Sequence, residues 1–336
     1  MIKMMCVIMN DFNPQLKFRP FKCKICGTSR YNNIIKREEM NFGLPGMFYY
    51  YECAECGSLN LSNIPKNLSR YYPREYMSRH ERYKNLKLFA SAIIYKIYVN
   101  GKTEQNLIKK IVEKLRGSYT MFSLIDVLLS LSHKTSFKGT SLLDVGANDG
   151  KFLKKIRLLD FRKLIGIDPF MDGSKGLGKK IKLLKKDIFN LNDKFDYVIL
   201  NHSIEHVKNP IKVMKKLREI IKDDGIVLIR TPLADSYAFK KYKQDWCHLD
   251  APRHILIFTH KSMKISAKKS GFKIKKIIYD ATEDTFRFSE LYKRNLLLSK
   301  NENYFDKKYI LEWTKLANKL NSEGGSDSAA FFLKPI

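Results

Sequence analysis

The order of apolar and polar residues changes character along the chain. From about residue 139 onward, short apolar segments alternate with segments that repeat apolar residues at helical spacing. Short apolar strands separated by helices predict an α/β fold with a parallel, doubly wound sheet, which binds its ligand at the carboxyl ends of the strands. The expected strands are residues 142–146, 163–168, 181–185, 197–201, 225–230 and 272–279.

A helical pattern precedes this part of the chain. Apolar residues recur at three- and four-residue spacing between about residues 78 and 131, for example at Leu86, Phe89 and Ile93. We expect two or three amphipathic helices here, the last over residues 121–131. They form either a connector packed on the next domain, or a helical lid over an active site or a dimer face.

Four of the six cysteines form two pairs, each with a two-residue spacer. A glycine, Gly27 or Gly57, follows each pair and can adopt the tight turn of a metal-binding knuckle. Two such pairs complete a tetrahedral thiolate shell, so we predict a structural zinc ribbon with residues 47–52 as its return strand. A disulfide clip and a redox pair are the alternatives. The expected zinc ligands are Cys23, Cys26, Cys53 and Cys56.

These patterns predict three domains in the 336 residues. A zinc-ribbon domain occupies residues 1–75, and a helical connector occupies residues 76–138. The α/β domain covers residues 139–336 and contains a helical insertion at about 283–322.

Composition excludes several classes of protein. Apolar residues make up 44% of the chain and charged residues 29%, which excludes global disorder. The apolar runs are far shorter than the roughly 20 residues that a membrane span needs. The N-terminus reaches Asn10 and Asp11 too early for a signal-peptide core. We therefore expect a soluble, cytoplasmic protein without a membrane span.

The formal net charge of +29 raises the question of an anionic partner. Basic residues are spread along the whole chain, and no segment holds the excess. Three interpretations remain: a generally basic, solvated surface, a site for a phosphorylated small substrate, or a nucleic-acid-binding face. The even distribution favours the first.

A glycine-containing loop follows the first strand of the α/β domain. Gly146 and Gly150 flank it, without a complete G-x-G-x-x-G pattern. The second strand leads to Asp168, about 20 residues further on, where a carboxylate can accept hydrogen bonds from both hydroxyls of a ribose. Asp187 follows the third strand, where an adenine amino group is expected. The alternatives are a plain strand-to-helix turn for the glycines and a helix N-cap for Asp187.

These segments resemble the class I S-adenosylmethionine-dependent methyltransferases, in the order and spacing of that family. The resemblance is carried by LLDVGANDGKFL (142–153), LIGIDP (164–169), KKDIFN (185–190), FDYVILNHSIEHVKNP (195–210) and DDGIVLIRTP (223–232). HLDAPRHILIFTHKSM (248–263) resembles a segment of the small-molecule branch that includes sugar- and glycan-modifying enzymes, and residues 320–336 fit its last, antiparallel strand. The resemblance implies a Rossmann-like methyltransferase sheet with S-adenosylmethionine as cofactor.

The resemblance also implies roles for individual residues. Asp144 shapes the loop, Gly146 lets the backbone pass close to the cofactor, Asp168 holds the ribose hydroxyls and Asp187 the adenine. The expected cofactor-binding residues are Asp144, Gly146, Asn148, Gly150, Asp168, Asp187 and Asn201.

Methyl transfer to a hydroxyl requires a base that removes the proton of the acceptor. His202 and His206 follow the strand that faces the expected methyl group, and His254 lies on a later loop at the same sheet edge, so each is a candidate base. A structural role in the following turn is the alternative for His206. The order His202-x-x-Glu205-His206 also resembles the metal site of ubiquinone-type O-methyltransferases, but His202 replaces its first acid, which argues against Mg²⁺.

The loop with His254 also carries the expected substrate-binding residues His248, Asp250 and Arg253. Arg253 can bind a carboxylate or phosphate in bidentate fashion. The alternative is a loop held by its own hydrogen bonds.

The leading hypothesis is therefore methyl transfer from S-adenosylmethionine to a small-molecule acceptor, a nucleotide-linked sugar or a surface-glycan precursor, with a histidine base. The alternatives are an RNA methyltransferase and a non-catalytic scaffold that binds no methyl donor. The net charge and the ribbon favour RNA. Against it, the strand at 197–201 continues into Asn-His-Ser-Ile and not into the Asn-Pro-Pro-Tyr type of sequence that grips a base amine.

Overall fold

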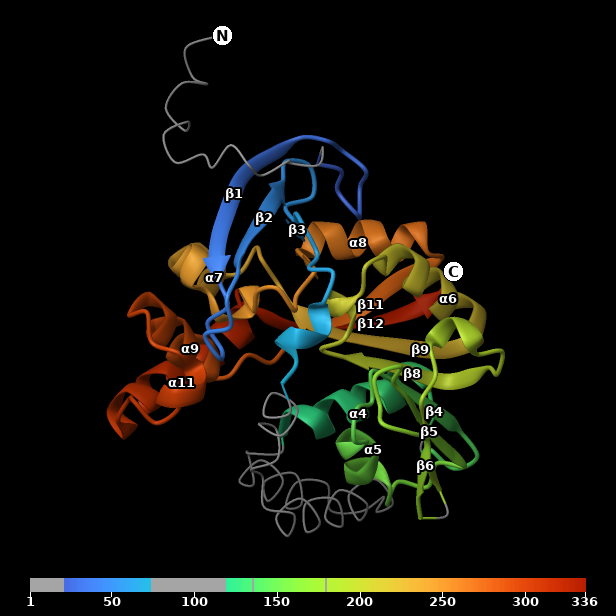
Figure 1. Cartoon of the computed structure of the whole chain (residues 1–336). Helices are drawn as coiled ribbons and strands as arrows, with labels where there is room; N and C mark the ends of the chain where they lie inside the picture. Colours follow the sequence, from blue (N-terminus) through green and yellow to red (C-terminus); the bar gives the residue numbers. More distant parts are fainter. Residues whose placement is uncertain (1–20, 74–118, 135, 179) are drawn as a thin grey trace.

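The computed structural model describes residues 21–73, 119–134, 136–178 and 180–336 (Figure 1). Its centre is an eight-stranded sheet in the order β11-β12-β9-β8-β4-β5-β7-β6. The strands are β4 (Ser141–Val145), β5 (Lys163–Ile167), β6 (Lys175–Leu177), β7 (Ile181–Leu184), β8 (Phe195–Asn201), β9 (Ile221–Pro232), β11 (Phe272–Tyr279) and β12 (Ser328–Pro335). Strands β7, β5, β4, β8 and β9 are parallel, and β12 is antiparallel to both of its neighbours.

This sheet confirms the Rossmann-like fold that the strand pattern predicts. The edge strand β6, antiparallel to β7, was not expected. Its sequence, Lys175-Gly176-Leu177, contains a single large apolar residue, so it carries no strand-like periodicity.

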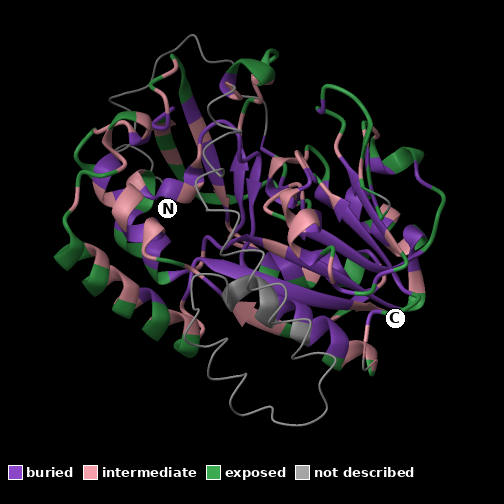
Figure 2. Ribbon diagram, turned by 90° about the horizontal axis from the view of Figure 1, so that it is seen from below, coloured by how far each residue is buried: buried purple, intermediate pink, exposed green. Residues whose placement is uncertain are grey.

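Successive residues of each central strand face opposite sides of the sheet and enter different cores. In β8, Val198 and Leu200 belong to one core, while Tyr197 and Ile199 belong to the other. Because helices cover both faces, the strands are apolar throughout and do not alternate with polar residues. Figure 2 shows the sheet strands in the buried colour and most exposed residues on outer helices and loops.

Helices α6 (Pro210–Ile220) and α8 (His260–Lys269) cover one face, and α4 (Tyr119–Ser132) and α5 (Lys151–Ile156) cover the other (Figure 1). Asn209 is the N-cap of helix α6, and its side chain accepts a hydrogen bond from the Lys212 amide. The first residue of the helix is Pro210, a position that favours proline. The other helices of the described residues are α7 (Tyr237–Tyr242), α9 (Asp284–Lys293), α10 (Leu298–Asn301) and α11 (Lys307–Glu323). Their 3₁₀ turns are η1 (Leu68–Tyr71), η3 (Ile188–Asn190), η4 (Ile204–His206), η5 (Lys243–Asp245) and η6 (Cys247–Leu249).

The predicted ribbon forms a second sheet that the rest of the chain completes. Its hairpin strands β1 (Tyr31–Glu38) and β2 (Met47–Cys53) pair with β3 (Leu59–Leu61), and β3 pairs with β10 (Leu256–Ile257). Strand β10 belongs to the segment that follows β9, so the α/β domain supplies the fourth strand of the ribbon sheet. The three-domain division stays a prediction, and this pairing joins two of its parts.

Two further expectations concern helices. Residues 283–322 contain helices α9, α10 and α11, and α4 lies where the last helix of the connector was expected. The rest of the connector, residues 76–118, lies outside the described residues. None of the helices in the described parts combines the length and the apolar character that crossing a bilayer requires.

Candidate active site

The loop between β4 and α5 bends sharply at the carboxyl edge of the sheet. Gly146 and Gly150 have φ angles of 81° and 76°, in the left-handed region that favours glycine. A Cβ atom on Gly146 would lie 2.8 Å from the Cβ of Ser203, so a side chain there cannot be accommodated without movement. The close approach of the loop to the turn after β8 therefore depends on glycine at position 146.

Asp168 connects this loop to the end of β5. Its carboxylate accepts hydrogen bonds from the backbone amides of Asn148 (3.2 Å) and Phe170 (2.9 Å). The amide of Gly146 donates to the Ile167 carbonyl at 2.9 Å. Asp168 is half-buried, so its carboxylate reaches the edge where parallel sheets bind nucleoside ligands. The tight loop and this acid are the two features that a ribose and a methionine tail require, so the residues present fit S-adenosylmethionine.

Asp144 lies inside the sheet below the loop and is 3% exposed. Burial and the negative charge of Asp168 raise the pKa of the Asp144 carboxyl to about 7. Near neutral pH the carboxyl is therefore divided between its neutral and its charged form. A bound cation such as a sulfonium or ammonium group would favour the charged form.

The other expected cofactor residues lie along the same edge. Asp187 is exposed and caps η3 by accepting a hydrogen bond from the Phe189 amide at 2.9 Å, which is the N-cap alternative of the sequence analysis. Asn201 ends β8, is exposed, and accepts a hydrogen bond from Arg230 at 3.2 Å. The assignments of both residues to the cofactor stay predictions.

Replacing Asp168 with alanine is expected to weaken binding of S-adenosylmethionine by about 1–3 kcal/mol, because two ribose hydroxyls would lose their acceptor. Titration calorimetry with S-adenosylmethionine measures the effect. The Asp193→Ala variant is the control, because it removes an exposed carboxylate that pairs with Lys163 and lies outside the predicted cofactor site. Unchanged affinity in Asp168→Ala would exclude this residue from the cofactor site.

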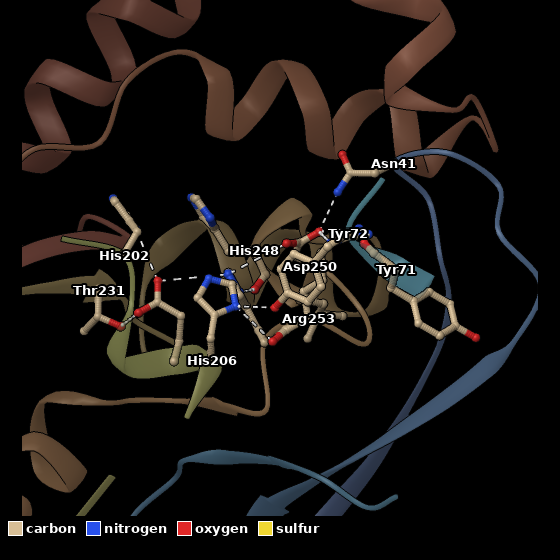
Figure 3. A network of polar contacts seen from close by, with 12 residues as sticks. Asn41, Tyr71, Tyr72, His202, His206, Thr231, His248, Asp250 and Arg253 are labelled. Carbon is tan, nitrogen blue, oxygen red and sulfur yellow. Dashed lines mark hydrogen bonds and ion pairs between the residues drawn. The ribbon is translucent and has the colours of Figure 1, made fainter. Parts of the chain in front are cut away.

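His202 stands at the start of the turn after β8 and contacts Glu205. Its Nδ1 lies 3.3 Å from Oε1 of Glu205 (Figure 3). A carboxylate can only accept, so Nδ1–H donates and the lone pair of the neutral ring is on Nε2. Glu205 is completely buried, and Oε2 accepts a hydrogen bond from Thr231 at 3.0 Å. Burial alone would raise the pKa of Glu205, but the His202 hydrogen bond and the nearby imidazoles lower it to about 2.

The other two histidines are fixed by backbone carbonyls. Nδ1 of His206 lies 3.0 Å from the Arg253 carbonyl oxygen and 3.1 Å from the Tyr72 hydroxyl. Nδ1 of His254 lies 2.7 Å from the His248 carbonyl oxygen. Burial, and then the charge of His206, lower the pKa of His254 to about 4, so its ring is neutral near pH 7. All three histidines predicted as bases therefore lie close to Glu205. The assignment of the base to one of them stays a prediction.

Arg253 is completely buried and paired with acids of the chain. Its Nη2 lies 2.6 Å from Oε1 of Glu39 and 2.6 Å from Oδ1 of Asp250, and Nη1 donates to the Tyr71 carbonyl at 2.8 Å. These contacts engage the guanidinium that we expected to bind a substrate anion. They match the alternative interpretation, in which the loop is held by its own hydrogen bonds. The contact with Glu39 also connects this loop to the ribbon.

His248 and Asp250, the other expected substrate-binding residues, differ in their surroundings. His248 is about a quarter exposed and lies 3.7 Å from Asp327. Asp250 is half-buried, and the charges of Arg253 and His254 lower its pKa although burial opposes them.

Sequence patterns missed Glu39, Tyr72 and Thr231, since no spacing relates them to the histidines.

The four ribbon cysteines converge on one point. In each knuckle, the glycine amide donates to the first cysteine carbonyl, Gly27 to Cys23 at 3.0 Å and Gly57 to Cys53 at 2.9 Å. The sulfur atoms are 3.6 Å apart between Cys23 and Cys56 and 3.5 Å apart between Cys26 and Cys53, and all four lie within 4.8 Å of one another. Tetrahedral Zn–S bonds of about 2.3 Å place sulfurs roughly 3.8 Å apart, so this set fits a zinc ribbon.

Comparisons with known proteins agree with the fold. Residues 115–277 match the methyltransferase domain family. Curated relatives include the tRNA U34 carboxymethyltransferases of Campylobacter fetus (28% identical over 124 residues, 34% of this chain and 42% of that enzyme) and Campylobacter lari (32% over 106 residues, 28% and 36%). The chain thus matches less than half the length of these relatives.

The solved structures that the chain matches include the cyclopropane synthase MmaA2 of Mycobacterium tuberculosis (16% identical, TM-score 0.40, covering 62% of this chain and 83% of that chain). A SAM-dependent methyltransferase from Archaeoglobus fulgidus is 20% identical, with a TM-score of 0.39 and coverage of 63% and 93%.

The comparisons correct the acceptor and the partner expected from the sequence. We predicted a nucleotide-linked sugar or surface-glycan precursor, but the curated relatives are named for tRNA, so this prediction, and the role in polysaccharide biosynthesis that it implied, is wrong. The segment that carried the small-molecule resemblance, residues 248–263, contains Asp250, Arg253 and β10, which hold the ribbon in place.

The scaffold alternative is also excluded, because the domain match and the intact cofactor loop indicate an enzyme. The sheet order, the loop at Gly146, Asp168 and the match over residues 115–277 together identify a class I S-adenosylmethionine-dependent methyltransferase domain in this chain.

Proposed function

We propose that this enzyme transfers a methyl group from S-adenosylmethionine to RNA, with tRNA as the substrate class. The observation that carries the proposal is the match of part of the chain to three curated enzymes named for tRNA U34. The matched segments cover at most 35% of this chain, so the nucleotide and position modified are not carried over with the name.

The charge and the surface at the cofactor edge support an RNA substrate. A net charge of +29 attracts a phosphate backbone. Phe170, two residues after Asp168, is 88% exposed, and Phe189 is 39% exposed with the Lys212 ammonium 4.7 Å from its ring centroid. Exposed aromatic rings beside lysines suit stacking of unpaired bases and contact with phosphates.

The turn after β8 supports a hydroxyl acceptor. When bound, S-adenosylmethionine supplies a methyl group on a sulfonium, and a hydroxyl must lose its proton to attack it. His202 is suited to take that proton at Nε2, because Glu205 holds its Nδ1–H. Glu205 would then stabilise the imidazolium, while its hydrogen bond to Thr231 keeps the carboxylate in place.

Transfer of tritium from labelled S-adenosylmethionine to unfractionated tRNA tests the proposed substrate. We expect label that precipitates with the RNA and is released by ribonuclease, and less label with the Asp168→Ala variant at a subsaturating concentration of S-adenosylmethionine. A mixture of nucleotide sugars serves as the competing acceptor. Label in the small-molecule fraction alone would overturn the RNA proposal.

We further propose that Cys23, Cys26, Cys53 and Cys56 bind one structural Zn²⁺. The support is the sulfur geometry and the pair of equivalent knuckles. With four protein thiolates the shell is closed, so this ion would stabilise the ribbon and take no part in the reaction.

Elemental analysis of the purified chain is expected to show that the Cys53→Ser variant holds one zinc fewer per chain than the wild type, because a Cys₄ site loses affinity with a missing thiolate. Cys247→Ser is the matched control, since this buried thiol lies outside the four-cysteine group. Equal zinc contents in wild type and Cys53→Ser would contradict the assignment.

A further inference from the structure

Three side chains from two loops converge beside His202. Glu205 and His206 belong to η4, and His254 belongs to the loop that follows η6. One ligand atom of each lies within 4.8 Å of the others, and Nε2 of His254 is 4.0 Å from Oε1 of Glu205. The rings of His206 and His254 have centroids 4.8 Å apart. The sequence motif grouped Glu205 and His206 with His202, whereas the fold brings His254 to them.

Backbone carbonyls at Nδ1 fix the orientation of both histidine rings. Nδ1 of His206 and Nδ1 of His254 each face a backbone carbonyl, at 3.0 and 2.7 Å, and a carbonyl only accepts. In the neutral rings the lone pair is therefore on Nε2. This is the arrangement of most metal-binding histidines, whose other ring nitrogen donates to a carbonyl or carboxylate.

The carboxylate is supported in the same way. Oε1 of Glu205 faces the Nδ1–H of His202, and Oε2 accepts from the Thr231 hydroxyl at 3.0 Å. Glu205 is completely buried and His254 is 6% exposed, so both are held by packing. Each of the three side chains thus has an outer partner that fixes its orientation.

We propose that Glu205, His206 and His254 form a binding site for one divalent transition-metal ion. Two imidazoles and one carboxylate are a ligand set that suits Zn²⁺ or Fe²⁺ and leaves coordination positions open, whereas Mg²⁺ prefers oxygen ligands throughout. Three ligand atoms at about 2.0–2.2 Å from one ion in tetrahedral geometry lie roughly 3.4 Å apart. Binding therefore requires the three side chains to approach one another by about 0.5–1.5 Å.

Co²⁺ added to the full chain with its ribbon already loaded with zinc is a probe that separates the two sites. We expect one Co²⁺ per chain, with ligand-field absorption but without the sulfur-to-cobalt charge-transfer band that cysteine ligands produce. His254→Ala and His206→Ala should each weaken Co²⁺ binding more than about 100-fold, the upper limit of typical outer-partner effects. Thr231→Val, which removes an outer partner, should weaken it about 10–100-fold.

The control is His133→Asn, a change of an exposed histidine at the opposite end of the fold, which should leave Co²⁺ binding unchanged. Binding of S-adenosylhomocysteine shows that each variant is folded. Absence of Co²⁺ binding by the wild type, a spectrum consisting of thiolate charge transfer, or full binding by His206→Ala and His254→Ala would each overturn the proposal. The first two outcomes need no variant, and none of them depends on the RNA substrate.

Discussion

Replacing His202 with alanine is expected to lower kcat by about 10²–10⁴-fold, because a positioned base typically contributes that much to a proton transfer. The ring is fixed by Glu205 at 3.3 Å and projects from the carboxyl end of β8. Affinity for S-adenosylmethionine should stay near that of the wild type, since the cofactor loop and Asp168 are untouched. Single-turnover methyl transfer at saturating cofactor, together with calorimetry, measures the two effects separately.

His133→Asn is the matched control for this experiment. His133 follows α4 with a φ of 55°, a conformation that asparagine tolerates, and its neighbour Lys134 contacts Asp196 near the start of β8. It therefore lies at the amino end of the sheet, away from the acceptor. Full turnover in His202→Ala would remove this residue as the base and leave His206 and His254 as the candidates.

Replacing Arg253 with alanine is expected to lower the free energy of unfolding by about 3–5 kcal/mol, the usual cost of removing one partner of a buried ion pair. The cost arises because the carboxylates of Glu39 and Asp250 would lose the guanidinium that contacts both of them. Both acids also accept other hydrogen bonds that stay intact, such as those from the amides of Phe42 and Leu44 to Glu39, at 2.9 Å each. Denaturant unfolding of the zinc-loaded protein measures the loss.

Arg30→Ala provides the comparison. Arg30 forms an ion pair with Glu55, but its side chain is 78% exposed, so its removal should cost at most about 1 kcal/mol. A double-mutant cycle of Arg253→Ala with Glu39→Gln should show strong coupling, because the two charges are in direct contact. A loss below about 1 kcal/mol in Arg253→Ala would mean that the ion pair does not hold the ribbon on the α/β domain.

Most of the predicted cofactor-binding elements could be recognised from short sequence patterns. The strand before Gly146, the turn to α5 and the strand before Asp168 are each encoded within a few residues, because apolar runs and glycines act on the backbone directly. The acceptor side was harder to predict. Arg253 looked like a substrate clamp because a bidentate cation on an active-site loop has that chemistry, and only its burial against Glu39 shows its pairing.

The sequence by itself determined the α/β fold, the cofactor loop and the pairing of the cysteines, since these depend on periodicity and on short, fixed spacings. Tertiary structure alone decided that His254 joins Glu205 and His206, that Arg253 meets Glu39 from 214 positions away, and that β10 completes the ribbon sheet. The physical reason is that buried charges and imidazoles choose their partners by proximity in the packed core. Residues far apart in the chain carry no spacing that reveals such contacts.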